Sequence, residues 1–250
     1  MAIRQTMLGL LVLTVPYADA QVTGQQADAV RQIGKENPFE TGWGKPVNPE
    51  NDCKFLRERG GLTIELPNRS HTLPVGGSPS PRGEGLKGVP LLLRNVTGDF
   101  VVQVRVAGTC KPTSNGKFPM TAGWAEAGLI VMADKRNFVR LAWCCHPTLR
   151  GWSRGPNWGE WKNGWCDSDH SQGGPGKVNR SMYLRLERKG RMLLAAYSHD
   201  GNKWQTQGPS VVCNWPANVK LGLMAEAAAV EAFKPHFDNF KLVVKPTQRQ

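Results

Sequence analysis

The sequence predicts an all-β protein folded as an antiparallel sandwich or barrel. Short segments alternate apolar and polar side chains with a period of two, which is typical of half-buried strands. Turn signals separate these segments, and the 250 residues include 28 glycines and 18 prolines. No helical segments alternate with the strands, which argues against a parallel sheet with crossover helices.

The expected strands follow one another along the chain. In the segment 100–106, Phe100, Val102, Val104 and Val106 share one face, and polar side chains occupy the other. The remaining expected strands are 62–66, 128–132, 138–143, 183–187, 192–197, 219–224 and 237–243. Lys189-Gly190 predicts a tight hairpin turn. Only Ala225 to Phe233 has a helical composition.

The first 20 residues have the pattern of a secretory signal peptide. Arg4 supplies the positive charge, residues 7–15 form an apolar run, and Ala18-Asp19-Ala20 is a small-x-small cleavage site. The run is shorter than the roughly 20 apolar residues that span a bilayer, and no other segment qualifies as transmembrane. We therefore expect a secreted, periplasmic or cell-envelope protein, with an uncleaved N-terminal anchor as the alternative.

After the signal peptide we expect a linker or short helix over 21–41 and a β-sandwich domain over 42–245. The net charge is +12, from 32 Lys and Arg against 20 Asp and Glu. Such an excess favours anionic partners. Nucleic acid is not expected for an exported chain, whereas an anionic component of the cell envelope remains an open partner.

Six cysteines in an exported chain predict disulfides. The candidates are Cys53, Cys110, Cys144, Cys145, Cys166 and Cys213. Cys144 and Cys145 are not expected to bond each other because vicinal disulfides are strained, and on a strand their side chains point to opposite faces. We expect one of the two to close a loop to Cys166. Zinc is not expected at Cys144-Cys145-His146, which lacks CxxC spacing.

The segment 144–177 departs from the strand pattern. It carries Trp152, Trp158, Trp161 and Trp165 among glycines and charged residues. It is too long for a hairpin turn, and loops of this length are usually functional or disordered. We therefore treat it as a Trp/Cys-rich insert.

A series of short stretches carries a family resemblance through its order along roughly residues 42–245. The stretches are Gly42-Trp43-Gly44, Asp52-Cys53-Lys54-Phe55, 62–67, His71-Thr72-Leu73, 92–96, 98–104, 127–131, 137–141, 183–188, 200–204 and 237–242. In this order they resemble the bacterial regulation-of-enolase type of concanavalin A-like domains, a family of unknown function. The resemblance implies a jelly-roll sandwich of two antiparallel sheets and no catalytic residues. Relatives usually have a shorter hairpin where this chain has its insert.

Non-catalytic carbohydrate binding by the insert is the leading functional hypothesis. Indole faces stack on the C–H faces of sugar rings and bury much area at low conformational cost. The predicted ligand-binding residues are Trp152, Trp158, Trp161, Trp165, Glu160 and Asp167, with Asn157, Asn163 and Asp169 as further hydrogen-bonding neighbours. The alternative is that the same indoles form a mini-core. The tryptophans assigned to sandwich packing are Trp43, Trp143, Trp204 and Trp215.

Two other function classes remain open. A glycoside hydrolase would need paired carboxylates, and the candidates are Glu126, Glu160, Asp167 and Asp169, although the Glu-x-Asp-x-x-Glu strand of related glycanases is missing. A structural or adhesive envelope protein would use basic side chains such as Arg185 and Arg188. No cofactor is expected. The resemblance implies one weak calcium candidate, Asp238, for which a backbone-bonded turn residue is the alternative.

Overall fold

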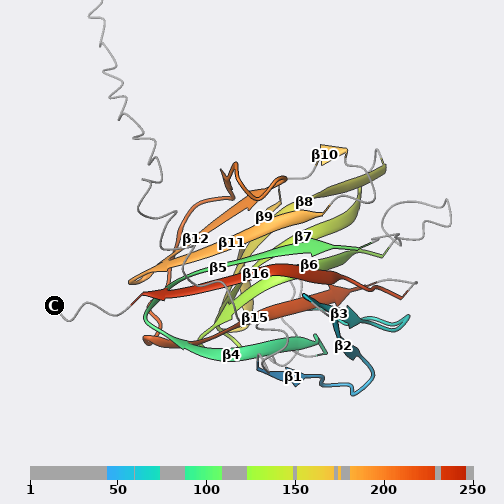
Figure 1. Cartoon of the computed structure of the whole chain (residues 1–250), viewed down its shortest axis with the longest axis horizontal. Coiled ribbons are helices and arrows are strands. Elements are labelled where there is room, and N and C mark those ends of the chain that lie inside the picture. The colour runs from blue at the N-terminus through green and yellow to red at the C-terminus, as the bar shows by residue number, and fades with distance from the viewer. Residues whose placement is uncertain are drawn as a thin grey trace, which may run out of the picture. The chain divides into compact units, whose positions relative to one another are not determined.

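Two antiparallel sheets, stacked face to face, make up the described part of the chain (Figure 1). The computed structural model describes residues 44–58, 60–73, 88–108, 123–148, 151–171, 174–175, 181–228 and 232–245, all within the unit Ile33–Gln250. These residues form strands and no α-helix, which confirms the predicted all-β sandwich. None of them forms a helix able to cross a membrane. The expected signal peptide and linker, with Trp43 and Cys110, lie outside the described residues.

The sheet that carries the candidate site is called the first sheet. Its strands in spatial order are β1 (Lys45–Val47), β4 (Leu91–Thr97), β15 (Asn218–Ala227), β6 (Ala125–Met132), β7 (Phe138–Thr148), β8 (Gly151–Lys162) and β10 (Gly174–Pro175), and β9 (Trp165–Ser171) also pairs with β8. All of these pairings are antiparallel.

The second sheet packs on the inner face of the first. Its strands in spatial order are β13 (Gln205–Thr206), β12 (Met192–Ser198), β11 (Met182–Lys189), β5 (Asp99–Ala107), β16 (His236–Lys245), β3 (Gly61–Glu65) and β2 (Lys54–Glu58), and β14 (Val211–Val212) pairs with β12. The predicted hairpin is confirmed, since Lys189 pairs with Met192 and leaves a two-residue turn. The first turn residue, Gly190, has the positive φ of 57° that such a turn requires.

Alternate side chains of the central strands fill the core between the sheets. Phe100, Val102, Val104 and Val106 of β5 are fully buried, and the residues between them are half-buried. They belong to one apolar cluster with side chains of the first sheet such as Leu141. Burial of each such side chain contributes about 1.5–3 kcal/mol. The predicted one-sided burial of this strand is therefore confirmed.

A second apolar cluster, called here the outer cluster, lies on the opposite face of the first sheet. Leu129 and Val131 point into the inter-sheet core, whereas Ile130 and Met132 belong to the outer cluster. Its buried members are Leu73, Val89, Leu91, Ile130, Met132, Phe138, Trp161 and Met224. Because both faces of β6 are covered, every residue of that strand is buried.

The described residues of the insert form sheet rather than loop, apart from a turn at Asn163 and Gly164. β8 pairs with β7 from Gly151 to Trp161, and β9 returns along β8. The expectation of a loop over these residues is wrong for a physical reason. Trp158 belongs to the inter-sheet core and Trp161 to the outer cluster, so both faces of β8 are buried and the period-two pattern is lost.

The first three residues of the segment with helical composition form a strand. Ala225–Ala227 end β15 and pair with Ala125–Ala127 of β6. Pairing within the sheet overrides the intrinsic helix propensity of alanine and glutamate. Residues 229–231 of this segment lie outside the described residues.

No disulfide joins two of the described cysteines, and Cys53, Cys144, Cys166 and Cys213 are free thiols. A pairing that involves Cys110 lies outside the described residues and stays a prediction. The expected closure from Cys144 or Cys145 to Cys166 is therefore not formed. The two adjacent cysteines do point to opposite faces of β7, since Cys145 lies in the inter-sheet core and Cys144 lines a pocket on the outer face. Buried free thiols such as those of Cys53 and Cys213 pack as small apolar side chains.

Candidate functional site

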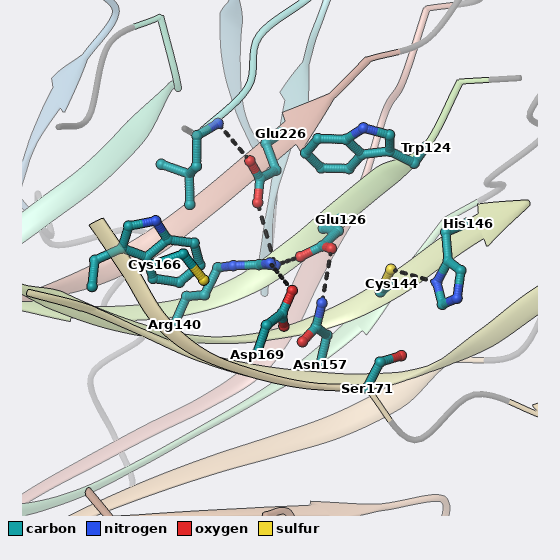
Figure 2. A pocket seen from close by; sticks show the side chains of 12 residues that line it. Trp124, Glu126, Arg140, Cys144, His146, Asn157, Cys166, Asp169, Ser171 and Glu226 are labelled. Carbon is teal, nitrogen blue, oxygen red and sulfur yellow. Dashed lines mark hydrogen bonds and ion pairs between the residues drawn. The ribbon is translucent and has the colours of Figure 1, made fainter. Parts of the chain in front are cut away.

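A pocket of about 250 Å³ opens on the outer face of the first sheet, beside the outer cluster (Figure 2). Strands β6, β7, β8, β9 and β15 supply most of its lining, and two residues outside the strands, Leu73 and Trp124, complete it. The lining side chains are Leu73, Trp124, Glu126, Arg140, Cys144, His146, Asn157, Trp161, Cys166, Asp169, Ser171 and Glu226.

Strand register brings the polar lining residues together. Glu226 of β15 pairs directly with Glu126 of β6, which in turn pairs with Cys144 of β7. Neighbouring side chains in such a row lie on the same face of a sheet. In a second row, Arg140 of β7 is followed by Gly159 of β8 and Asp169 of β9.

Gly159 leaves the space that the Trp161 ring occupies. A Cβ atom at this position would lie 2.6 Å from the ring, closer than real Cβ contacts allow. The ring stacks on Phe138 with a centroid distance of 4.8 Å, and the Arg140 guanidinium lies 5.0 Å from its centroid. The indole is therefore held within the outer cluster and supports Arg140.

Arg140 is the central charge of the pocket. Its guanidinium contacts the Glu126 carboxylate directly. Nη1 lies 3.3 Å from Oε1 of Glu226, and Nη2 lies 3.9 Å from Oδ2 of Asp169. Only 6% of the Arg140 side chain is exposed. One buried cation thus faces three carboxylates, which come from β6, β9 and β15 and point toward it (Figure 2).

The two glutamates differ in their remaining contacts. Oε2 of Glu226 accepts a hydrogen bond from the backbone N–H of Leu73 at 2.8 Å. Oε1 of Glu126 accepts one from Nδ2 of Asn157 at 3.1 Å. Burial raises the pKa of Glu226, and Arg140 offsets this increase only in part. Glu226 therefore has an elevated tendency to hold a proton.

Cys144 and His146 form a neutral pair on the wall of the pocket. The Cys144 Sγ lies 3.3 Å from Nδ1 of His146. Burial raises the pKa of the Cys144 thiol. Burial also lowers the pKa of His146, with a partial offset from Asp169. Both shifts disfavour the thiolate–imidazolium form that a nucleophilic cysteine requires.

The side of the pocket nearest the solvent combines an indole with polar groups. Trp124 comes directly before β6 and is half-buried. Asp169 and Ser171, both on β9, are exposed. Asn157 is 4% exposed, and no described residue donates a hydrogen bond to its Oδ1 atom. The pocket thus offers one aromatic face together with amide and carboxylate groups.

The predicted tryptophan platform is only partly described, and two of its members are buried. Trp158 is fully buried in the inter-sheet core, where its Nε1 donates to the backbone oxygen of Pro209. Trp161 is 2% exposed. A stacking platform built on these two rings is wrong. The rings are buried in two different clusters, so they do not form one mini-core either. Trp165 is 49% exposed, and the side chain of Trp152 lies outside the described part.

The two predicted carboxylate partners lie away from the pocket. Glu160 is buried, and its Oε2 lies 3.1 Å from Nζ of Lys162. Asp167 is half-exposed and lies 2.8 Å from the same ammonium group. Ser168 pairs with Glu160 and Cys166 with Trp161, so Asp167 is the extra residue at a break in register. Both carboxylates are therefore engaged in ion pairs at one end of β8.

Other assignments made from the sequence have mixed outcomes. Trp143 lies in the inter-sheet core and Trp215 packs against it, as expected. Trp204 instead lies under the Arg185 guanidinium, which is 5.5 Å from the centroid of the Trp204 ring.

The calcium candidate, Asp238, forms an ion pair with Arg105. Both of its carboxylate oxygens face the Arg105 guanidinium, and Nε of Arg105 lies 2.6 Å from Oδ1. That guanidinium occupies the side from which an ion would be coordinated.

The sequence-based candidates omit several lining residues, and they include three others only in secondary roles. The omitted residues are Leu73, Trp124, Arg140, Ser171 and Glu226; those named in secondary roles are Glu126, Asn157 and Asp169. The available signal was one charged residue within each of two apolar strands: Arg140 in 138–143 and Glu126 in the strand that contains 128–132. A charge at such a position predicts a buried partner of opposite sign.

Comparisons with known proteins show the fold. No family model and no curated protein matches the chain, so the regulation-of-enolase family stays a prediction. A functionally unknown protein from Saccharomyces cerevisiae has a similar structure, with a TM-score of 0.61 and 18% identity over 82% of this chain and 97% of that chain. The exoplasmic/lumenal domain of VIP36, in a Ca²⁺/Man₂-bound form, has a TM-score of 0.50 and 14% identity over 79% and 81%.

A third similar structure is the GH43 protein BlXynB from Bacillus licheniformis, with a TM-score of 0.53 and 12% identity. The likeness covers 80% of this chain but 36% of that protein. This chain therefore spans little more than a third of the larger protein's length. The fold is a jelly-roll sandwich of two antiparallel sheets, as predicted.

Proposed function

We propose that this chain is an exported carbohydrate-binding module that holds its ligand in the outer-face pocket without catalysis. The observation that carries the proposal is the lining of this pocket. A half-buried indole, Trp124, accompanies an amide and carboxylates, and the cavity is open to solvent at Asp169. Pockets that bind polar small molecules combine apolar walls with a few fixed polar groups.

Trp124 supplies the apolar surface for a sugar ring. An indole face packs on the axial C–H groups of a pyranose at little cost in conformational entropy. Hydroxyl groups of the sugar then reach Asn157, whose Oδ1 has no described donor, and Asp169 on β9. A ligand hydroxyl that donates to Oδ1 would satisfy a buried acceptor, which stabilises the complex.

The pocket size limits the ligand. Its volume of about 250 Å³ lies just below the roughly 300–1,000 Å³ that is usual for drug-sized ligands. We therefore expect one sugar unit, at a chain end or as a branch, rather than a long stretch of polysaccharide. The Ca²⁺/Man₂-bound form named for the VIP36 domain supports saccharides as a ligand class for this fold.

A glycan array on the mature protein, followed by calorimetry on the best ligand, tests the proposal. Trp124→Ala should weaken binding at least tenfold. Trp165→Ala is the matched control, because this indole is 49% exposed and does not line the pocket. Its affinity should stay within twofold of wild type. Binding lost in Trp165→Ala but kept in Trp124→Ala would place the ligand on the insert, and no glycan bound at all would overturn the proposal.

Glycoside hydrolysis is the second candidate function. One observation favours it: Glu226 has a raised pKa and stands beside a second carboxylate, Glu126. Paired carboxylates with different pKa values are the usual acid and base of glycosidases. Release of reducing sugar that Glu226→Gln abolishes would establish this function. Because Arg140 contacts both carboxylates, binding remains the better supported proposal.

A further inference from the structure

Three potential metal ligands, none of which lines the pocket, meet at the edge of the sandwich. Asp52 and Cys53 lie on the connection from β1, at the edge of the first sheet, to β2, at the edge of the second. His71 forms an isolated bridge with Ala227, which ends β15. Cys53 and His71 are buried, and the Asp52 side chain is 23% exposed. Solvent therefore reaches this group from the side of Asp52.

The ligand atoms of these residues have the spacing of a tetrahedral zinc site. The Cys53 Sγ lies 3.8 Å from Nε2 of His71 and 3.6 Å from Oδ1 of Asp52. Nε2 of His71 lies 3.2 Å from Oδ2 of Asp52. Ligand atoms around a tetrahedral Zn²⁺ with bonds of about 2.0–2.3 Å lie about 3.4–3.6 Å apart. The two Asp52 distances involve different oxygens of the carboxylate; with one ligand atom taken from each residue, the three atoms lie within 4.8 Å of one another. They therefore have to move closer together to share one ion.

The orientation of His71 distinguishes this group from a catalytic relay. In a Cys–His–Asp relay, the thiol and the carboxylate contact different ring nitrogens. Here both face the same nitrogen, Nε2. The other nitrogen, Nδ1, lies 2.8 Å from the backbone oxygen of Gly88, to which it donates a hydrogen bond. This contact leaves the Nε2 lone pair free for a metal, and it is the usual outer contact of a metal-bound histidine.

We propose that Asp52, Cys53 and His71 bind one Zn²⁺ ion, with water as the fourth ligand. A thiolate, an imidazole and a carboxylate are a donor set that suits zinc. The thiolate and the carboxylate together balance the charge of the ion. Burial, with the neighbouring Asp52 charge, raises the pKa of the Cys53 thiol to about 12. Zinc therefore displaces the thiol proton when it binds.

The chain holds these ligands in place without the ion. Asn48 clamps the backbone of Cys53, since its Nδ2 donates to the Cys53 oxygen at 2.7 Å and its Oδ1 accepts from the Cys53 N–H at 3.3 Å. His71 exchanges two backbone hydrogen bonds with Ala227, at 2.7 and 2.9 Å. The Arg69 guanidinium contacts Oδ2 of Asp52. Its positive charge disfavours a metal ion at the same carboxylate. This side chain is 49% exposed, so it can swing into solvent.

Cobalt substitution in the full chain tests the site directly. Co²⁺ bound to a thiolate gives a sulfur-to-metal charge-transfer band, and tetrahedral Co²⁺ gives intense visible bands. We expect both bands at one equivalent of Co²⁺, and their loss on addition of Zn²⁺. Cys53→Ser should lose the charge-transfer band. Cys166→Ser is the matched control, since this thiol lines the pocket, and it should keep the spectrum. An unchanged spectrum in Cys53→Ser, or no bands in wild type, would overturn the proposal.

A stability measurement covers the case in which Cys53→Ser fails to fold. Zn²⁺ that binds only the folded state raises Tm in proportion to the logarithm of its concentration. Asp52→Asn keeps the shape of a partly exposed side chain, and it should lose most of this rise. A Tm rise of equal size in wild type and Asp52→Asn would contradict the site. Neither result depends on the proposed carbohydrate binding, which Trp124→Ala tests without contact with this site.

Discussion

Glu126 and Glu226 occupy directly paired positions on β6 and β15, and both carboxylates contact Nη1 of Arg140. They are 4% and 0% exposed. Two adjacent carboxylates repel each other strongly in a low-dielectric interior. The guanidinium between them offsets part of this repulsion. Burial raises the pKa of Glu226, which favours its uncharged form. The three side chains therefore behave as one electrostatic unit on the floor of the pocket.

Removal of the cation should destabilise the fold severely. Arg140→Met keeps an apolar side chain of similar length but leaves two buried carboxylates without their partner. The loss of one member of a buried ion pair costs about 3–5 kcal/mol. Urea denaturation at neutral pH should show a loss of this size in the free energy of unfolding.

Arg185→Met is the matched control for that experiment. Arg185 is half-buried on the outer face of the second sheet and lies over Trp204. A partly solvated cation–π contact contributes about 0.5–1 kcal/mol, so this variant should lose no more than that. Equal losses in the two variants would show that Arg140 does not hold the glutamates together.

The stability of the protein should depend on pH through Glu226. Burial raises the pKa of this carboxyl above its ordinary value of 4.5. Below that value, the folded and unfolded states both carry the proton. As pH rises through 4.5 toward the folded-state pKa, the unfolded state ionises first, so the wild-type protein loses stability.

Glu226→Gln removes this titration and keeps an oxygen to accept the hydrogen bond from Leu73. The free energy of unfolding of the variant, relative to wild type, should therefore increase as pH rises above 4.5. Urea denaturation of both proteins at a series of pH values measures it. A difference that stays constant with pH, or that falls as pH rises, would contradict a raised pKa.

The strands that could be predicted from the sequence are those with one buried face. β5 and β11 alternate buried and half-buried residues along their lengths, so apolar and polar side chains alternate in the sequence as well. The turn at Gly190 was visible because a two-residue hairpin requires a positive φ. In these elements the local sequence pattern and the tertiary packing favour the same backbone conformation.

Strands buried on both faces were harder to recognise. β8 was expected to be loop, because Trp158 and Trp161 face different clusters and glycines interrupt the pattern. One of these, Gly159, is required by the position of the Trp161 ring. A glycine in a strand reads as a loop signal in the sequence, but here it marks close packing.

The candidate site could be predicted only in fragments. Arg140 can be recognised in the sequence as a charged residue within an apolar strand. Its partner Glu226, however, lies in a segment of helical composition. Only the pairing of β15 with β6 brings the two together. The site expected from the sequence was placed where tryptophans are most frequent. At Trp158 and Trp161, however, the indoles are buried and contribute to packing.

Two tryptophans of the insert should differ sharply in their contribution to stability. Trp158 is fully buried in the inter-sheet core, so Trp158→Ala should cost about 3–5 kcal/mol. Trp165 is 49% exposed, and surface substitutions usually change stability by about 0.5 kcal/mol or less. Chemical denaturation of both variants measures the difference. A small loss in Trp158→Ala would restore the open platform that the sequence suggested.

Thiol counting should establish whether the cysteines are paired. Cys53, Cys144, Cys166 and Cys213 are free, and all of them but Cys166 are buried. Purified protein, unfolded without a reductant and treated with an excess of maleimide, should gain at least four adducts by intact mass. Among these four cysteines, the half-buried Cys166 should react first in the native protein, because reaction requires access to the sulfur. The same count after reduction is the control. Fewer than four adducts before reduction, with more after it, would show that a disulfide joins residues that the structure holds apart.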